Sequence, residues 1–254
     1  MIRSYFEEFP TLANLAKLNL VKGKTKLYLA AKSFKEFETI VNKIKKSGNG
    51  SKVIEYIYWP ILDKKEGYWI SPFTKRSALK RIFEELKKGK GTKYSVMLDL
   101  ELPTTKNPWL YVTQMLNFFS NKKMIKRFIS SHKGKVYLAE YYPTGKLKEK
   151  FMGFIGIHFN DSKVFVIKMI YHSLHDFNKK FITNKLQSGV EEFGDKYLVA
   201  LGTIAKGING DEPLLSLKQL KQDLRIAKEN GVSEVVIFRL GGLNEKYVGV
   251  LNNS

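Results

Sequence analysis

The hydrophobic pattern alternates between two kinds of segment from about residue 26 to the end of the chain. Short apolar runs, rich in β-branched and aromatic residues, have the length of buried strands. They cover residues 27–31, 53–59, 94–101, 136–142, 164–171, 197–203 and 234–240. Runs rich in Lys and Glu separate them and have the spacing of amphipathic helices. Near-continuous apolar strands that alternate with helices predict an α/β fold, with a parallel sheet covered on both faces.

Three of the helical runs carry the clearest signals. Residues 33–46 and 75–88 place apolar side chains every three or four positions, as a helix with one buried face requires. Residues 216–230 add end signals, because Ser216 can cap the N-terminus and Gly231 lies just past the C-terminus. These patterns predict helices between consecutive strands.

The length of 254 residues and the order of the elements favour a (β/α)₈ barrel. Only seven strands are marked, so residues 151–159 could supply the eighth, or residues 147–159 could form the helix before the next strand. Residues 1–23 look helical and could cover the bottom of the barrel. We therefore expect an N-terminal helical extension at residues 1–25 and a single barrel domain at residues 26–254. The third and fourth marked strands should be parallel neighbours in that barrel.

The charge balance is strongly basic, with 44 Lys and Arg against 24 Asp and Glu, a formal charge of +20 and a pI near 9.8. Such a field attracts nucleic acid, anionic lipid or an acidic polysaccharide, whatever the fold. Many of the lysines fall on the helical runs or in loops. We therefore expect the positive charge to be spread over the helices rather than focused on one cleft.

Two absences in the sequence narrow the class of protein. The chain has no cysteine, which excludes disulfides, thiolate metal sites and cysteine nucleophiles. No apolar run reaches the roughly 20 residues that span a bilayer, and acidic residues interrupt the N-terminal segment where a signal peptide needs an apolar core. We expect a soluble, cytoplasmic protein. Its Lys- and Ile-rich composition would also suit a thermostable one.

Candidate chemistry begins in residues 96–103, an apolar run that ends in two carboxylates. In a strand, Asp99 and Glu101 would lie on one face together with Met97. Like charges this close raise the pKa of one carboxyl group, which makes it a usable general acid near neutral pH. A structural acidic pair, satisfied by a nearby Lys or Arg, explains the same spacing.

The active site of a parallel barrel lies at the C-terminal ends of its strands. Glu140 is a candidate second carboxylate there. The substrate-binding candidates at strand ends and in the following loops are Tyr58, Trp59, Trp69, Tyr142, Tyr171, His172 and Arg239. Aromatic rings stack on the apolar faces of sugars, and an arginine could bind an acidic group or keep a carboxylate ionised. The alternative is that these aromatic residues only cap the core.

Residues 98–103, Leu-Asp-Leu-Glu-Leu-Pro, resemble the end of the D-x-x-D-x-D-x-E motif of family 18 glycoside hydrolases, the chitinase-like barrels. Residues 169–172, Met-Ile-Tyr-His, resemble the later M-x-Y-D strand of that family. Met97 stands where the family has its middle Asp, and His172 replaces the Asp that follows the Tyr. The likeness covers about a dozen residues of the chain.

The resemblance implies a carbohydrate substrate and general acid/base catalysis by carboxylates. By that likeness Glu101 protonates the glycosidic oxygen, Asp99 is its electrostatic partner, and Tyr171 contacts the acyl group of the substrate. If two carboxylates act, a separation of about 5 Å would give retention and one of about 6.5–9.5 Å inversion. No cofactor or metal is expected, since His158, His172 and His175 do not form a known metal spacing.

Two other functions stay open at this stage. Lys168 lies inside an apolar strand and could form a Schiff base in a lyase or isomerase, with the Gly-rich segments 202–207 and 241–242 binding phosphate. Alternatively, the chain could be a non-catalytic protein whose basic surface binds nucleic acid or another polyanion. The sequence carries no nucleic-acid-binding motif and does not specify an oligomeric state.

Overall fold

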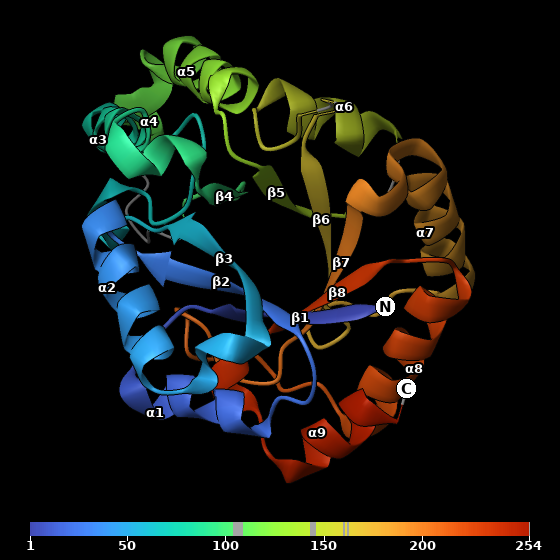
Figure 1. Cartoon of the computed structure of the whole chain (residues 1–254). Coiled ribbons are helices and arrows are strands. Elements are labelled where there is room, and N and C mark those ends of the chain that lie inside the picture. The colour runs from blue at the N-terminus through green and yellow to red at the C-terminus, as the bar shows by residue number, and fades with distance from the viewer. Residues whose placement is uncertain (104–108, 143–145, 160, 162, 254) are drawn as a thin grey trace. The chain divides into compact units, whose positions relative to one another are not determined.

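In the computed structural model, eight parallel strands close into a barrel in chain order, which confirms the predicted α/β barrel (Figure 1). The structure describes residues 1–103, 109–142, 146–159, 161 and 163–253. The strands are β1 (Ile2–Glu7), β2 (Thr25–Ala31), β3 (Val53–Pro60), β4 (Ser95–Asp99), β5 (Val136–Tyr141), β6 (Phe165–Ile170), β7 (Tyr197–Gly202) and β8 (Glu234–Phe238).

The helices of the described residues follow the strands along the chain. They are α1 (Leu12–Ala16), α2 (Phe34–Lys46), α3 (Arg76–Leu86), α4 (Trp109–Met115), α5 (Phe118–Ser131), α6 (Lys146–Phe154), α7 (Lys179–Phe193), α8 (Leu217–Glu229) and α9 (Glu245–Asn252). Ser216 caps α8 as predicted, since its hydroxyl accepts from the backbone N–H of Gln219. Within the part of the chain that the structure describes, no helix combines the length and the apolar character needed to cross a membrane.

The N-terminal segment corrects the helical prediction. Ile2–Glu7 is strand β1, which pairs in parallel with both β2 and β8. Residues 4–8 are buried, so the segment gains backbone partners on two sides and a place in the core that a helix here would lack. Helix begins only at Leu12, after Thr11, whose side chain accepts from the backbone N–H of Asn14. The eighth strand is therefore β1. Helix α6 occupies most of residues 147–159, the segment considered as a strand or a helix from the sequence.

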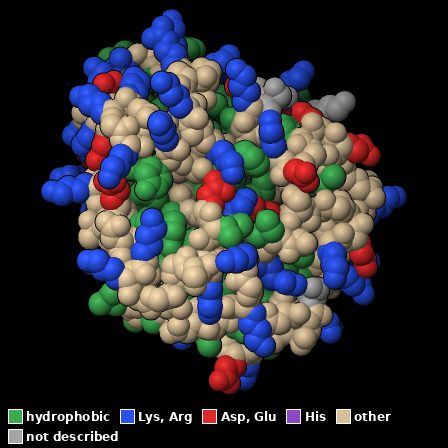
Figure 2. Space-filling view, in the orientation of Figure 1, with side chains coloured by type: hydrophobic (Ala, Val, Ile, Leu, Met, Phe, Trp, Pro, Cys, Tyr) green, Lys and Arg blue, Asp and Glu red, His purple; other side chains and the backbone are tan. Residues whose placement is uncertain are grey.

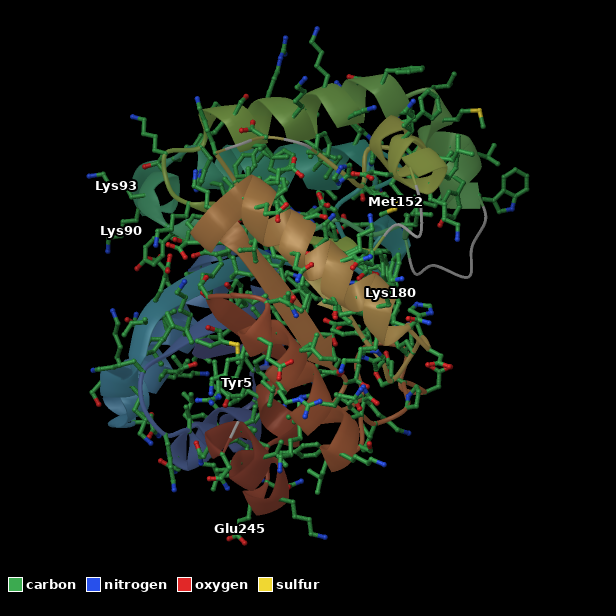
Figure 3. All side chains as sticks on the ribbon, turned by 90° about the vertical axis from the view of Figure 1, so that its right-hand side faces the viewer. Tyr5, Lys90, Lys93, Met152, Lys180 and Glu245 are labelled. Atoms are coloured by element: carbon green, nitrogen blue, oxygen red, sulfur yellow. The ribbon has the colours of Figure 1, made fainter. Side chains whose placement is uncertain are left out.

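The chain divides into two compact units. The first comprises residues 1–30, 39–57 and 166–254. In it β8 lies between β1 and β7, with Val235 opposite Arg3 on one side and Val199 on the other. Helix α8 packs on α9, and the labelled Tyr5 and Glu245 mark β1 and the start of α9 (Figure 3).

The second unit comprises residues 31–38 and 58–165. Here β4 and β5, the third and fourth strands marked in the sequence, are parallel neighbours as predicted, with Val96 opposite Val136. Helices α3 and α5 pack through Phe83 and Phe128, whose rings stack with their centroids 4.4 Å apart. Asp99 and Glu140 belong to this ladder, and Glu101 follows β4 by two residues.

Candidate active site

The pairing of β4 with β5 fixes which side chains share a face. Asp99 lies opposite Ala139, and the N–H of Leu100 donates to the carbonyl of Ala139 at 2.9 Å. Paired residues of a parallel ladder point to the same side, and successive residues alternate. Asp99 therefore shares a face with Ala139 and Tyr141 of β5, and the side chain of Glu101, just beyond β4, contacts the same Tyr141.

Glu101 lies two residues beyond the end of β4 and is only 6% exposed. Its Oε2 accepts a hydrogen bond of 2.8 Å from the phenol of Tyr141. Asp99, the last residue of β4, is 5% exposed, and its carbonyl accepts from the N–H of Ile70 at 3.0 Å. Two neighbouring carboxyl groups are thus buried at the C-terminal end of a barrel strand, where barrel enzymes build their active sites.

Glu140, the predicted second carboxylate, has different partners from Glu101. Alternation along β5 puts it on the opposite face of the ladder from Tyr141, and therefore from Asp99. Its fully buried carboxylate binds Nδ1 of His158 at 2.7 Å and accepts from the N–H of Phe159 at 3.3 Å. Glu140 orients His158, whose other nitrogen lies 3.7 Å from Glu149.

The predicted aromatic residues of the second unit differ in their surroundings. Tyr58 is fully buried and packs against Phe34 and Phe37 of α2, which is the environment of a core side chain rather than of a sugar-binding one. Burial raises the pKa of its phenol strongly, and nearby carboxylates add to the shift. Trp59 is also buried. Two others, Trp69 and Tyr142, are half-buried and follow the ends of β3 and β5.

The predicted residues near β6 lie in the first unit. Lys168 is a buried residue of β6 and stands opposite Val199 of β7. Tyr171 directly follows the strand and is 8% exposed, with its ring centroid 6.1 Å from that of Phe238. His172 comes next and is half-buried.

His172 is held by an acidic residue of α8 that the sequence did not single out. Its Nδ1 lies 3.0 Å from Oδ1 of Asp223, whose carboxylate also accepts from the side chain of Gln219. Burial alone would lower the pKa of His172, but the hydrogen bond and the negative charge of Asp223 outweigh it and raise the pKa above the usual 6.5. His172 is therefore a candidate pH-sensitive contact between β6 and α8.

Arg239 forms an ion pair with a buried carboxylate of β1. Its Nη1 lies 3.0 Å from Oε1 of Glu7, the last residue of β1. Glu7 is fully buried and also accepts from the backbone N–H groups of Phe9 and Gly241 and from the side chain of Asn14. Burial raises the pKa of Glu7, and the positive charge of Arg239 with these N–H donors limits that rise.

The Gly-rich loop after β7, predicted as a phosphate site, already surrounds a carboxylate of this chain. Glu212 accepts from the backbone N–H groups of Gly207, Asn209 and Gly210 at 3.0–3.2 Å. The N–H of Gly241 donates to Glu7 in the same way. A phosphate could use these donors only by displacing a carboxylate of the protein.

Sequence reasoning missed four functional candidates: Tyr141, Glu7, Asp223 and the pairing of His158 with Glu140. Each partner lies far from the other in sequence, up to 232 residues in the case of Glu7 and Arg239. For Tyr141 the sequence signal was its position at the end of a predicted strand, whereas Glu7 lies in a segment predicted to be helical. Among the residues that the structure describes, no group of three or more His, Asp or Glu side chains could hold a metal ion.

Comparison with known proteins supports the fold. No protein-family model matches the sequence, and neither does any curated protein. A chitinase from Chromobacterium violaceum is 9% identical with a TM-score of 0.56, over 99% of this chain and 98% of that one. A class V chitinase from Pseudomonas fluorescens is 10% identical with a TM-score of 0.58, over the same shares. A GH18 chitinase from Pseudoalteromonas aurantia is 8% identical with a TM-score of 0.55, over 100% of this chain and 99% of that one. At such low identities these likenesses show a common barrel fold.

Proposed function

We propose that this chain is a carbohydrate-acting barrel of the glycoside hydrolase type, with Glu101 as its general acid/base and Asp99 as the electrostatic partner. The observation that carries the proposal is the hydrogen bond of 2.8 Å from Tyr141 to Oε2 of Glu101. It joins a buried carboxyl group to the neighbouring strand, at the end of the barrel where catalytic residues gather. A carboxyl group anchored close to the ends of rigid strands is oriented before the substrate arrives.

Known structures of similar fold support the same class of substrate. Three of them are chitinases, and a further barrel, a spore cortex-lytic enzyme of Bacillus cereus, is 12% identical with a TM-score of 0.53. The spore enzyme is matched over 99% of this chain and 73% of its own length. Chitin oligosaccharides are therefore the first substrates to test.

In the proposed reaction Glu101 gives its proton to the glycosidic oxygen as the bond from that oxygen to the anomeric carbon breaks. A water molecule then adds to the anomeric carbon and returns a proton to the Glu101 carboxylate. Asp99, on the face of the ladder that carries Tyr141, stabilises the positive charge that develops on the sugar ring. Half-buried Trp69 and Tyr142 are the candidates for contact with sugar rings.

The two other functions have weaker support. The N–H groups of the predicted phosphate loops are engaged by Glu212 and Glu7, which argues against a phosphate-binding lyase. For a polyanion-binding protein we would expect one continuous basic patch. Lys and Arg side chains are instead scattered across the visible face (Figure 2).

The test is hydrolysis of a panel of chitin oligosaccharides and other glycosides, with products separated by chromatography. We expect the wild type to cleave at least one member and Glu101→Gln to lose about 10²-fold or more in turnover, the usual scale of acid/base catalysis. Glu245→Gln, at an exposed site on α9, is the matched control and should keep the wild-type rate. The proposal fails if the wild type cleaves no glycoside, or if Glu101→Gln retains its activity.

A further inference from the structure

Helix α6 turns an apolar stripe away from the protein. Leu147, Phe151 and Phe154 are spaced four and three residues apart, so they share one side of the helix. They are 85%, 60% and 59% exposed. In an ordinary surface helix the stripe with this spacing faces the core and the charged side faces water. In α6 the stripe faces outward instead, and its large apolar side chains are exposed alongside Lys148 and Lys150.

A second stripe runs from α4 into the start of α5. Trp109, Val112, Leu116 and Phe119 follow one another at intervals of three or four residues. Their exposed fractions are 66%, 55%, 97% and 74%. Single exposed apolar residues are normal on protein surfaces, but contiguous sets of large ones mark binding surfaces.

The two stripes belong to one surface of the second unit. The ring of Phe118 in α5 lies 5.1 Å from that of Phe119 in the second stripe and 6.1 Å from that of Phe154 in the first. Lys122 of α5 donates to the carbonyls of Gly153 and Phe154 at 2.8 and 2.9 Å, which ties α6 to α5. Figure 3, where Met152 marks α6, shows this helix beside α4 and α5. We call the two stripes together the α4–α6 surface.

The charge around the α4–α6 surface is mainly positive, and Glu149 of α6 lies beside His158. Residues 109–131 contain no Asp or Glu, and α5 carries Lys122, Lys123, Lys126 and Arg127. Exposed Lys148 and Lys150 flank the stripe of α6. Clustered cations next to exposed apolar side chains are the pattern of proteins that bind anionic bilayers, because the lysines attract the headgroups while the apolar residues enter the acyl region.

A cavity with several basic side chains in its lining lies beside the surface. It lies between α3 and α5, has a volume of about 450 Å³, and is lined by Arg76, Lys87, Lys123 and Arg127 together with Ser120 and Ser130. Ser120 directly follows Phe119 of the apolar stripe. Guanidinium, ammonium and hydroxyl groups are the donors that phosphate oxygens accept from.

We propose that the α4–α6 surface binds an anionic phospholipid bilayer. The aliphatic residues decide between the possible occupants, since Val112, Leu116 and Leu147 have no ring to stack on a sugar but are well suited to acyl chains. The mainly positive rim matches an anionic lipid surface. It would repel an identical rim on a second copy of the chain.

The test is sedimentation of the purified chain with vesicles of phosphatidylcholine alone or with about one third phosphatidylserine. We expect the wild type to bind the mixed vesicles and to bind pure phosphatidylcholine at least about tenfold more weakly. Leu116→Ser/Phe151→Ser should weaken binding by at least about tenfold, because two large apolar side chains no longer enter the bilayer. The matched control is Leu12→Ser/Leu214→Ser, in the first unit, where the two leucine side chains are 72% and 55% exposed. This variant should bind the vesicles as the wild type does.

A second pair of variants separates this surface from general charge attraction. Lys123→Gln/Lys126→Gln removes two cations of α5 and should weaken binding to the anionic vesicles. Lys218→Gln/Lys221→Gln removes two cations from the other basic cavity, on α8, and should leave binding nearly unchanged. Equal losses in both variants would overturn the proposal, since binding would then reflect only the net charge.

The fluorescence of Trp109 gives an independent readout. Trp109 is 66% exposed, whereas Trp59 is 2% exposed and Trp69 is half-buried. Mixed vesicles should shift the emission of the wild type to shorter wavelength, and Trp109→Phe should remove most of that shift. The proposal is wrong if the wild type does not sediment with the mixed vesicles. It is also wrong if the wild type is a dimer and Leu116→Ser/Phe151→Ser converts it to monomers without changing lipid binding.

Discussion

The phenol of Tyr141 donates a hydrogen bond of 2.8 Å to Oε2 of Glu101 from the neighbouring strand. The register of β4 and β5, with Asp99 opposite Ala139, brings the two residues together just beyond the last ladder pair. Tyr141 is the last residue of β5, and Glu101 follows β4 by two residues, so both side chains are anchored close to strand ends. A carboxyl group fixed in this way keeps its direction when the substrate binds, which is what general acid catalysis requires.

Tyr141→Phe tests whether this hydrogen bond positions Glu101. We expect kcat on the best glycoside to fall about tenfold while KM stays near the wild-type value, because a misaligned acid affects the transition state more than substrate binding. Tyr247→Phe removes a comparable hydrogen bond, from a phenol to the carbonyl of Leu215 in the first unit, and serves as control. Equal kinetics for the two variants would mean that the Tyr141 contact is only structural.

Glu140→Gln tests the role of the third carboxylate. Glu140 is fully buried and binds His158 and the N–H of Phe159, on the face opposite Asp99. We expect the free energy of unfolding to fall by about 1–3 kcal/mol, measured in denaturant, because a buried charge-assisted hydrogen bond is lost. Turnover per folded molecule should stay close to that of the wild type. A loss as large as that of Glu101→Gln with unchanged stability would return Glu140 to the catalytic set.

The features that could be predicted from the sequence are those that depend on the local pattern of apolar and polar residues. Alternating apolar runs located seven of the strands, and the end of one of them located Asp99 and Glu101. The face of Glu140 could not be predicted, because it depends on the register between β4 and β5, and a shift of one residue would reverse it. Strand β1 was missed for a similar reason, since its partners β2 and β8 are distant in sequence.

Glu7→Gln should destabilise the protein through Arg239. Glu7 is fully buried, and Arg239 is 13% exposed in its side chain, so the substitution leaves a mostly buried positive charge without its main partner. The expected loss in free energy of unfolding is about 3 kcal/mol, the scale for breaking a buried ion pair from one side. Chemical denaturation of this variant and of Glu245→Gln, at an exposed site, checks the value. Equal stability of the two variants would contradict a stabilising role for the ion pair between Glu7 and Arg239.

The contact between His172 and Asp223 should make stability depend on pH. The pKa of His172 is raised in the folded protein, chiefly because the hydrogen bond and charge of Asp223 outweigh the effect of burial. The pKa of His172 is therefore higher in the folded protein than its value of 6.5 in the unfolded chain. The contact stabilises the folded protein fully when the pH is below 6.5, and this stabilisation is lost as the pH rises through the pKa of the folded state. Asp223→Asn should remove this dependence, so the stability advantage of the wild type over the variant should shrink as the pH increases from about 6.

His132 supplies the control, because its pKa is shifted in the opposite direction. Burial lowers the pKa of His132, and a hydrogen bond with the carbonyl of Tyr94 only partly offsets that effect. Its contribution to stability is therefore present at higher pH and is lost as the pH falls. His132→Gln should leave the loss of stability at rising pH intact, whereas Asp223→Asn should flatten it. If denaturation curves across this pH range give Asp223→Asn and the wild type parallel profiles, the proposed role of the His172 contact is wrong.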